Sequence, residues 1–290
     1  MRMNLEGRPL GAFSLLISSV ASTLFTTGSA PYSCAVAQKK KTSAKKATAR
    51  KSSRKPAPQS DREVLPIRPF LWLLRWCARV FVAVLLLLFL WIVVYSVVNP
   101  PGTVYIWQEK SRLGSVDQQW VQMDQIAPVM KRSVVAAEDA NFCQHSGFDI
   151  AAIRAAIADG GGRGASTLTQ QVVKNAFLWH GRSWLRKSVE ALMTPMVELI
   201  WSKERILEVY LNLAEFDEGV FGIEPAARHY FGVGPEALSA VQSARLAMVL
   251  PAPKQRSASR PDANARDRSA AIMDGAATIL ADGRAHCFED

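Results

Sequence analysis

The stretch VFVAVLLLLFLWIVVYSVV, from Val80 to Val98, contains nineteen residues without a charge and divides the chain into a short first part and a longer second part. A helix of this length spans the hydrocarbon core of a bilayer, and a buried helix of a soluble protein is seldom apolar on every face. Aromatic residues suited to the membrane interface lie near its two ends: Trp72, Trp76, Trp91 and Tyr95. The pattern predicts one transmembrane helix within an anchor region of residues 69–99.

The segment before this helix is strongly basic. Residues 1–79 hold fifteen Lys and Arg against three Asp and Glu, whereas residues 80–290 hold twenty against twenty-two. The net charge of +10 therefore belongs to one end, which excludes a basic groove across a folded domain and argues against a nucleic-acid partner. By the positive-inside rule, we expect residues 1–68 to be a cytoplasmic low-complexity tail. Residues 100–290 would then form a periplasmic domain, anchored in a bacterial inner membrane.

Two features of the N-terminus leave its processing open. Leu10 to Phe25 is a weak apolar stretch, and Ala35-Val36-Ala37 resembles a signal-peptidase site. Cleavage there would export the basic tail against the positive-inside rule, so an uncleaved leader or an early start codon fits better.

The four cysteines divide into two pairs by compartment. Cys34 and Cys77 fall on the cytoplasmic side or at the membrane entry, whereas Cys143 and Cys287 fall in the exported domain. Because that setting is oxidising, a Cys143–Cys287 disulfide is our hypothesis. No spacing of Cys and His predicts a zinc site.

After Pro101 the hydrophobic residues recur mainly with a helical period, which predicts an irregular all-α domain. The one short strand candidate is Thr103–Trp107. The expected helices are Ile126–Ala140, Ile150–Ala158, Ser166–Phe177, Trp184–Trp201, Lys203–Phe216, Glu224–Tyr230 and Ser239–Leu250.

Two adjacent acids, Glu138 and Asp139, follow the apolar run SVVAA. Their carboxylates point to different sides of a helix, so at least one of them must face partly inward. A semi-buried glutamate near Phe142 and Phe148 has a raised pKa, which suits a general acid or base near neutral pH. The alternative is a salt-bridged helix end, with His145 or an arginine as the partner.

The segment GASTLTQQVVKN, residues 164–175, predicts a helix start followed by a polar stripe. Thr167 and Gln170 fit a capping box. Thr167, Gln171 and Lys174 are spaced i, i+4 and i+7, so a hydroxyl, an amide and an ammonium share one face. Such a stripe suits sugar hydroxyls or a phosphate, and a solvated helix face is the alternative.

Two further segments carry charge and aromatic rings. Arg186, Lys187 and Glu190 place two cations and a carboxylate within about a turn and a half of helix, which suits an anionic ligand or a plain surface ion pair. The segment FLWHGRSWLR, residues 177–186, interleaves aromatics with arginines, which suits contact with a bilayer or an ordinary core.

Taken together and in this order, four segments between Val121 and Pro253 resemble the family 51 glycosyltransferases, the peptidoglycan polymerases. EDANFCQHSGFD resembles the first motif of that family, GASTLTQQVVKN the second and RKSVE the third. The stretch WSKERILEVYLNLAEFDEGVFGIEPAARHYFG resembles the motifs that follow. Because no long second domain follows, the chain is most similar to the monofunctional members. It departs from the family at Ala165, where a second glycine is usual.

The resemblance implies a lysozyme-like helical fold and an inverting polymerisation of lipid II into β-1,4-linked glycan, with undecaprenyl pyrophosphate as the leaving group. It implies that Glu138 is the general base and Glu190 a second essential glutamate near the pyrophosphate, where a divalent cation, Mg²⁺ or Mn²⁺, could assist. It assigns support of the catalytic loop to Asp139, Phe142 and His145. It assigns donor binding to Ser166, Thr167, Gln171, Lys174, Arg186 and Lys187.

Two other classes of function stay open from the sequence. A lysozyme-like hydrolase or lytic transglycosylase would cleave glycan on the same fold, but it would not need the cations near Glu190. A non-catalytic membrane scaffold would use the tail and the anchor, with cell-division or cell-wall synthesis proteins as its partners.

Overall fold

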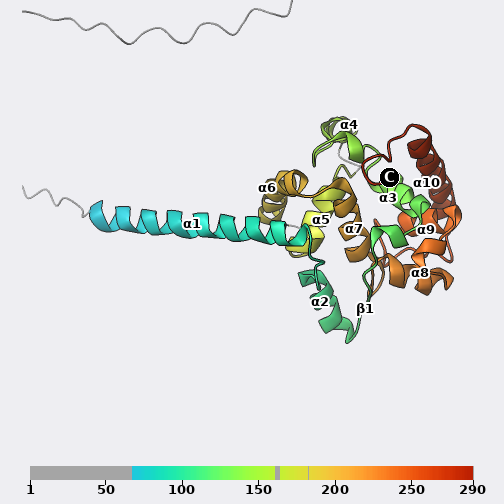
Figure 1. Ribbon diagram of the computed structural model, residues 1–290, viewed down its shortest axis with the longest axis horizontal. Coiled ribbons are helices and arrows are strands. Elements are labelled where there is room, and N and C mark those ends of the chain that lie inside the picture. The colour runs from blue at the N-terminus through green and yellow to red at the C-terminus, as the bar shows by residue number, and fades with distance from the viewer. Residues whose placement is uncertain (1–66, 161–163, 182, 290) are drawn as a thin grey trace, which may run out of the picture. The chain divides into compact units, whose positions relative to one another are not determined.

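The computed structural model describes residues 67–160, 164–181 and 183–289 (Figure 1). These residues form α1 (Ile67–Tyr95), α2 (Val104–Leu113), α3 (Pro128–Glu138), α4 (Ile150–Ala158), α5 (Leu168–Phe177), α6 (Trp184–Ile200), α7 (Lys203–Leu213), α8 (Ile223–Phe231), α9 (Ala240–Val249) and α10 (Ala263–Ala281). The predicted leader, the basic run, Cys34 and the middle of the glycine-rich loop lie outside the described residues. The predominance of helices confirms the expected all-α class.

A small sheet and three short 3₁₀ helices complete the described structure. The strands β1 (Asp117–Gln118), β2 (Glu215–Asp217) and β3 (Val220–Phe221) lie in the order β1-β3-β2, with β1 parallel and β2 antiparallel to β3. The 3₁₀ helices are η1 (Met123–Gln125), η2 (Phe142–Gln144) and η3 (Pro235–Ala237). Since α7 ends at Leu213 and the chain enters β2, the predicted helix Lys203–Phe216 is too long.

Within the part of the chain that the structure describes, one helix is long and apolar enough to cross a membrane, from Pro69 to Tyr95 in α1. It extends ahead of the uncharged run Val80–Val98, since the Leu, Ala and Arg residues before Val80 favour a helix. It ends at Tyr95, ahead of the two prolines. Most side chains of this helix face outward, as a lipid-facing helix requires.

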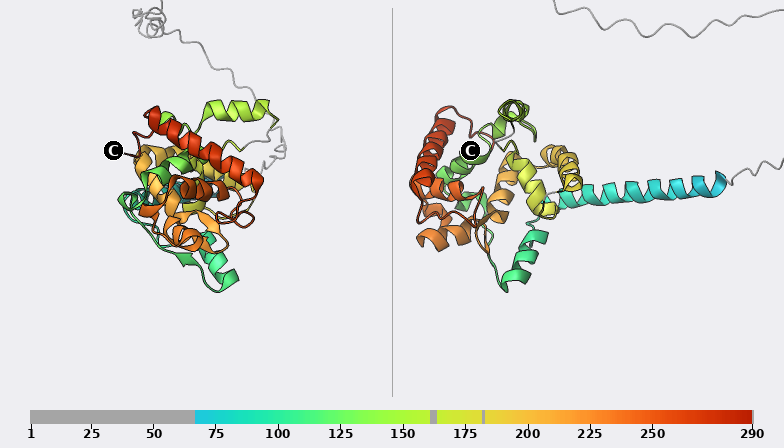
Figure 2. Two further views of the ribbon diagram at one scale, coloured as in Figure 1. Left: turned by 90° about the vertical axis from the view of Figure 1, so that its right-hand side faces the viewer. Right: turned by 180° about the vertical axis from the view of Figure 1, so that it is seen from behind.

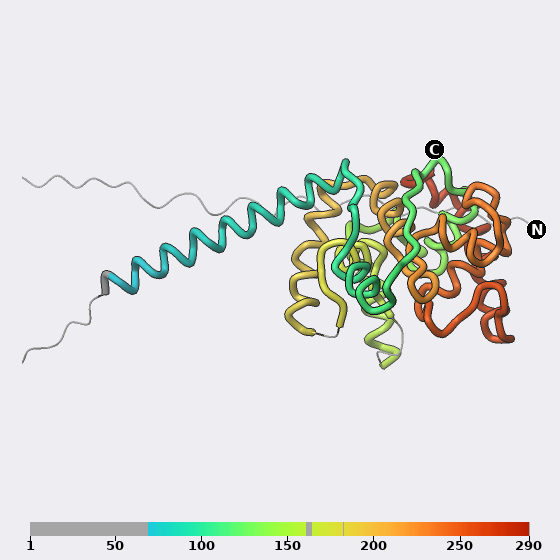
Figure 3. Tube along the Cα trace, turned by 90° about the horizontal axis from the view of Figure 1, so that it is seen from below, coloured from blue at the N-terminus to red at the C-terminus, as the bar shows by residue number. Residues whose placement is uncertain are grey.

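The helical domain after residue 100 holds the carboxyl end of α1 through two side chains, those of Trp201 at the end of α6 and Arg205 in α7. The indole N–H of Trp201 donates to the carbonyl of Ile92 at 2.8 Å, and Arg205 Nη2 donates to the carbonyls of Tyr95 at 3.1 Å and Val98 at 2.9 Å. These donors bond carbonyls in the last turn of α1 and just after it, and the carbonyl of Ile92 also accepts from the Ser96 N–H at 3.2 Å. Figure 3 shows the end of α1 beside α6.

Two groups of helices enclose the core. In one group α5 packs between α6 and α7, and in the other α3, α9 and α10 pack together (Figure 2). Gly275 of α10 lets the two backbones of α10 and α3 approach closely, since a Cβ at that position would lie 3.2 Å from Ala136 Cβ. The largest fully buried side chains include Phe142, Phe216, Phe221, Met130, Leu168, Met193, Leu207 and Leu211.

Two further features differ from the sequence-based expectation. The predicted strand Thr103–Trp107 is the start of α2, where Thr103 Oγ1 accepts a hydrogen bond from the Ile106 N–H as the N-cap. A short run of β-branched and aromatic residues does not distinguish a strand from a capped helix. Helix α10 was not expected at all, because its many alanines and its central glycine blur the apolar stripe.

Candidate active site

Glu138 is the last residue of α3 and lies where the chain leaves the helix. Its Oε2 accepts a hydrogen bond of 2.8 Å from Gln171 Nε2, while its Oε1 is buried without a hydrogen-bond partner. Burial raises the pKa of this carboxyl, and the Gln171 bond and the charges of Arg268 and Lys174 only partly offset the effect. The raised pKa that the sequence suggested is therefore present, and its cause is desolvation.

Asp139 has a different role from its neighbour. Its Oδ1 lies 2.8 Å from His145 Nε2, and its Oδ2 accepts from the Leu168 N–H at 3.0 Å, in the first turn of α5. Phe142 is fully buried beside His145, and Lys203 Nζ lies 4.4 Å from the centre of its ring. The alternative with His145 as the partner thus holds for Asp139, and these contacts join the loop after Glu138 to α5.

Thr167 caps α5 in the predicted capping box with Gln170. Its hydroxyl donates to the carbonyl of Gly147 at 2.7 Å and the residue is only 2% exposed. The structure therefore separates Thr167 from the polar stripe that the spacing predicted, because an N-cap side chain turns back onto its own helix. Gln171 and Lys174 remain together, and Ser166 is exposed beside Lys187, with 3.5 Å between its Oγ and Lys187 Nζ.

Glu190 of α6 lies among cations and is 2% exposed. Its Oε2 accepts from Arg186 Nη1 at 2.6 Å, and its Oε1 contacts Lys187 Nζ. This cluster is not a plain surface ion pair, since the carboxylate is buried. Lys174 lies close enough to feel the charges of both Glu190 and Glu138, but burial lowers the pKa of its ammonium.

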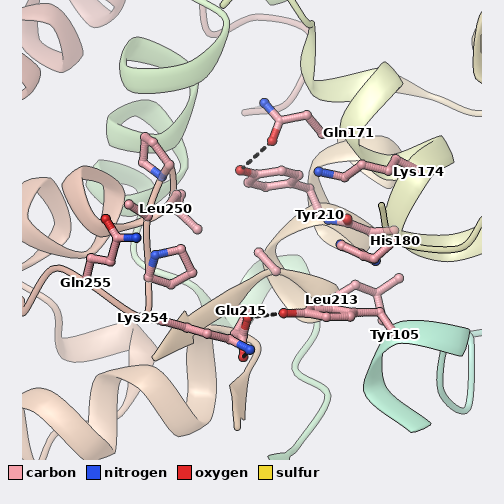
Figure 4. A pocket seen from close by; sticks show the side chains of 15 residues that line it. Tyr105, Gln171, Lys174, His180, Tyr210, Leu213, Glu215, Leu250, Lys254 and Gln255 are labelled. Carbon is pink, nitrogen blue, oxygen red and sulfur yellow. Dashed lines mark hydrogen bonds and ion pairs between the residues drawn. The ribbon is translucent and has the colours of Figure 1, made fainter. Parts of the chain in front are cut away.

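A cavity of about 360 Å³ opens beside these groups (Figure 4). Gln171, Lys174 and His180 line one side, and the segment from Leu250 to Gln255 lines the other. Tyr210 lies between the two sides and donates from its hydroxyl to Gln171 Oε1 at 3.3 Å. The polar face of α5 is therefore the wall of a cavity and not a solvated helix face.

Sequence reasoning missed the groups at the other end of this cavity. Tyr105 donates to Glu215 Oε2 at 2.6 Å and stacks on the ring of His180, and Lys254 lies 3.6 Å from Glu215 Oε1. Burial lowers the pKa of His180 to about 4, so this imidazole is neutral at pH 7. These residues come from four distant segments, and no local spacing could have revealed them.

The predicted disulfide is present. Cys143 in η2 and Cys287 in the C-terminal segment are bonded, with 5.7 Å between their Cα atoms. Cys77 is an exposed free thiol.

The aromatic residues of segment 177–186 differ in burial, so some belong to the core and others could contact a bilayer. Phe177 is buried against Trp91, Tyr95 and Trp201 in the core. Trp184 is 90% exposed at the start of α6, next to an exposed Leu185. Contact with a bilayer thus stays open for the exposed rings of this segment, Trp179 and Trp184.

Two residues that line the polar cavity connect it to a proton acceptor and a group of cations: Gln171 holds Glu138, and Lys174 lies within the field of the Glu190 cluster. One oxygen of Glu138 has no hydrogen-bond partner, and burial of the carboxyl favours its protonated form. The ammonium of Lys174 interacts with the charges of both Glu138 and Glu190. This arrangement suits a reaction in which a hydroxyl loses its proton as negative charge develops on a leaving group.

Comparison with known proteins gives a consistent result. The sequence model of the family described as Transglycosylase matches residues 108–277. A biosynthetic peptidoglycan transglycosylase of Jannaschia sp. (strain CCS1) is 58% identical over 214 residues, which cover 74% of this chain and 90% of the relative.

Two Pseudomonas relatives carry the same name. That of Pseudomonas putida (strain W619) is 50% identical over 64% of this chain and 80% of its own length. That of Pseudomonas fluorescens (strain SBW25) is 46% identical over 76% of this chain and 92% of its own length. The expected lysozyme-like helical domain agrees with this family. The chain therefore belongs to the transglycosylase family and is a glycosyltransferase of peptidoglycan synthesis.

Proposed function

We propose that this enzyme polymerises lipid II into β-1,4-linked glycan and releases undecaprenyl pyrophosphate. The observation that carries the proposal is the state of Glu138. One oxygen is held by Gln171, the other is buried and unpartnered, and burial raises the pKa of the carboxyl. A base in this state takes a proton readily near neutral pH.

In the proposed reaction Glu138 takes the proton of the acceptor GlcNAc 4-hydroxyl. The hydroxyl oxygen forms a bond to C1 of the donor MurNAc, and the bond from C1 to the pyrophosphate oxygen breaks with its electron pair. The configuration at C1 inverts because a single displacement occurs. In support, Glu190 is tied to Arg186 and Lys187 and is not free to act as a nucleophile, which a retaining mechanism would need.

Lys174, Arg186 and Lys187 supply the positive charge for the pyrophosphate. Lys174 forms no ion pair among the described residues, so its ammonium is free for an anionic ligand, and the approach of such a ligand would reverse the lowering of its pKa. Glu190 fixes the other two cations in place before substrate arrives. Preorganised cations of this kind stabilise charge that develops in the transition state.

The residues present do not fit a metal held by the protein alone. The described residues contain no group of three or more His, Cys, Asp or Glu side chains that could hold a metal ion. Both oxygens of Glu190 already contact cations. A divalent cation, Mg²⁺ or Mn²⁺, therefore enters this proposal only as a companion of the substrate pyrophosphate, and no step above passes through it.

The membrane part of the proposal places the N-terminus in the cytoplasm and the active site outside the inner membrane. The apolar helix α1 and the exposed Trp184 and Leu185 support a site at the bilayer surface, where a polyprenyl tail can remain in the lipid. Labelling of the exposed domain by an impermeant reagent in intact spheroplasts checks this orientation.

Incubation of the purified full chain with labelled lipid II, in detergent and with a divalent cation, tests the activity. The parent should form glycan polymer and release undecaprenyl pyrophosphate, and folded Glu138→Gln should not. A parent that leaves lipid II unchanged but shortens existing glycan would favour the lytic alternative. A parent inactive in both assays would favour a scaffold.

A further inference from the structure

The C-terminal segment, residues 282–289, lies against the loop that follows Glu138. We call this segment the C-terminal clasp. It begins where α10 ends, and Gly283 turns the chain with a φ of +67°, a conformation that a side chain would strain. The clasp follows the last residue matched by the family, residue 277. Its contacts therefore join a segment outside the matched residues to residues inside them.

Three kinds of contact join the clasp to the catalytic loop. Cys287 is bonded to Cys143. Phe288 is buried, with its ring 6.3 Å from that of Phe142. Arg284 Nη1 donates to the carbonyl of Ala140 at 3.0 Å, two residues after Glu138.

A fourth contact fixes the end of the clasp on α3. Arg132 Nη1 lies 2.5 Å from Glu289 Oε2, and both side chains are mostly buried. Arg132 precedes Glu138 in α3, whereas Ala140 and Cys143 follow Glu138 in the loop. The clasp therefore contacts the chain both before and after Glu138.

The loop is also held from α4 and α7, since Asn141 Nδ2 donates to Asp149 Oδ2 at 2.9 Å and Lys203 Nζ donates to the carbonyl of His145 at 2.7 Å. Residues 142–144 form a single 3₁₀ turn whose N-cap, Asn141, makes no capping bond from its side chain. Asp139 ties the inner side of the loop to α5 and His145, whereas the clasp ties the outer side. A general base displaced by about 1 Å loses on the order of a hundredfold in rate.

We propose that the C-terminal clasp, locked by the Cys143–Cys287 disulfide, positions Glu138 for proton transfer. Cys287 and Arg284 are thus positioning residues for the reaction and not catalytic ones. The inference rests on the proposed function of Glu138. It predicts that opening the clasp slows the chemical step more than it weakens substrate binding.

The pH dependence separates positioning from mere stability. Several groups face Glu138: Arg268 from α10, Lys174 and Gln171 from α5, Tyr210 from α7, and the adjacent Asp139. If the loop loosens and water enters, the pKa of Glu138 falls toward its ordinary value. The acidic limb of the kcat profile then moves to lower pH, although kcat itself declines.

The test compares four variants of the full chain: Cys143→Ser/Cys287→Ser, Arg284→Met, its conservative partner Arg284→Lys, and Gly232→Ala as a stability control. Gly232 has a φ of +68° at the end of α8 and does not line the cavity. We expect the double serine variant to lose about tenfold or more in kcat with KM changed less than twofold. Its Tm should fall by roughly 5–10 °C.

Arg284→Met should show a smaller kcat loss with the disulfide intact, and Arg284→Lys should restore part of it. Hydrogen exchange of peptides covering residues 138–147 should quicken in the double serine variant, whether or not the parent polymerises lipid II. Gly232→Ala should lose stability while keeping kcat and this exchange pattern. Unchanged kcat, acidic limb and exchange in both clasp variants would overturn the proposal. A parent inactive on lipid II with the expected exchange change would instead reject the proposed function and leave the clasp in place.

Discussion

Glu138 and Glu190 are both carboxylates withdrawn from solvent at one active site, but their surroundings differ. Glu138 has one amide donor and one buried, unpartnered oxygen. Glu190 has a cation at each oxygen. Burial with few partners favours a group that exchanges a proton, whereas burial with full pairing favours one that stays charged and holds its neighbours in place. The same residue type thus serves two purposes because different side chains surround it.

After the loss of Glu138 itself, the largest effect should come from removing the fully paired carboxylate, Glu190. Glu190→Gln leaves Arg186 and Lys187 without their shared carboxylate, so we expect polymerisation to fall by roughly a thousandfold. The free energy of unfolding should fall by roughly 2–4 kcal/mol, less than for a fully buried pair because Lys187 is 41% exposed. Initial rates and denaturant unfolding measure the two effects.

Glu224→Gln is the matched control for that variant. Glu224 is another buried glutamate, 4% exposed and paired with Arg228 at i, i+4, but unlike Glu190 it is not among the charges that act on Lys174. It should lose stability and keep its rate. Equal loss of rate in both variants would show that Glu190 acts through the fold alone.

Lys174 interacts by charge with both glutamates, and its removal should lower the rate without lowering the stability. Lys174→Met deletes a cation that burial already disfavours, so the rate should fall by about a hundredfold while Tm stays the same or rises. Steady-state kinetics and a thermal melt check this, with Lys131→Met, a buried lysine of α3 outside the cavity, as the control. A destabilised Lys174→Met would contradict the assignment.

Gln171 influences the pKa of Glu138 through its hydrogen bond to that carboxyl. The amide donates to Glu138 and lowers the pKa of that carboxyl, so Gln171→Leu raises this pKa further. Because the base must be deprotonated, the acidic limb of kcat should move to higher pH, and the rate at pH 7 should fall by about tenfold. Tyr210→Phe removes only the hydroxyl bonded to Gln171 Oε1 and should change the profile little. A profile that shifts in the opposite sense would exclude Glu138 as the titrating base.

Thr167 should show the smallest effect on rate. Thr167→Ala removes the α5 cap at a cost of about 1 kcal/mol, and Ser239→Ala removes the same kind of cap from α9. Because the Thr167 hydroxyl also donates to the carbonyl of Gly147, Thr167→Ala should lose more stability than Ser239→Ala, and both variants should keep rates within about threefold. A much slower Thr167→Ala would place this hydroxyl on the substrate.

The sequence could predict the parts of the site that depend on local order. Thr167 and Gln170 form a capping box by their spacing alone, and Glu138 follows an apolar helix that forces it inward. The far end of the cavity depends on packing between distant segments, so Tyr105, His180 and Lys254 could not be placed. Helix α10 was missed for a related reason, because Gly275 and the alanines that allow close packing on α3 weaken its amphipathic pattern.

The most direct test of the account measures the rate and the thermal stability of Glu138→Gln in the same preparation as the parent. A raised pKa means that folding disfavours the ionised carboxyl, so the stability that Glu138 contributes is full below its ordinary pKa and is lost as pH rises through the folded one. The glutamine variant should therefore be inactive on lipid II and melt a few degrees above the parent at pH 7, with this gain gone near pH 4. A variant that still polymerises lipid II, or that melts below the parent at pH 7, would contradict the account.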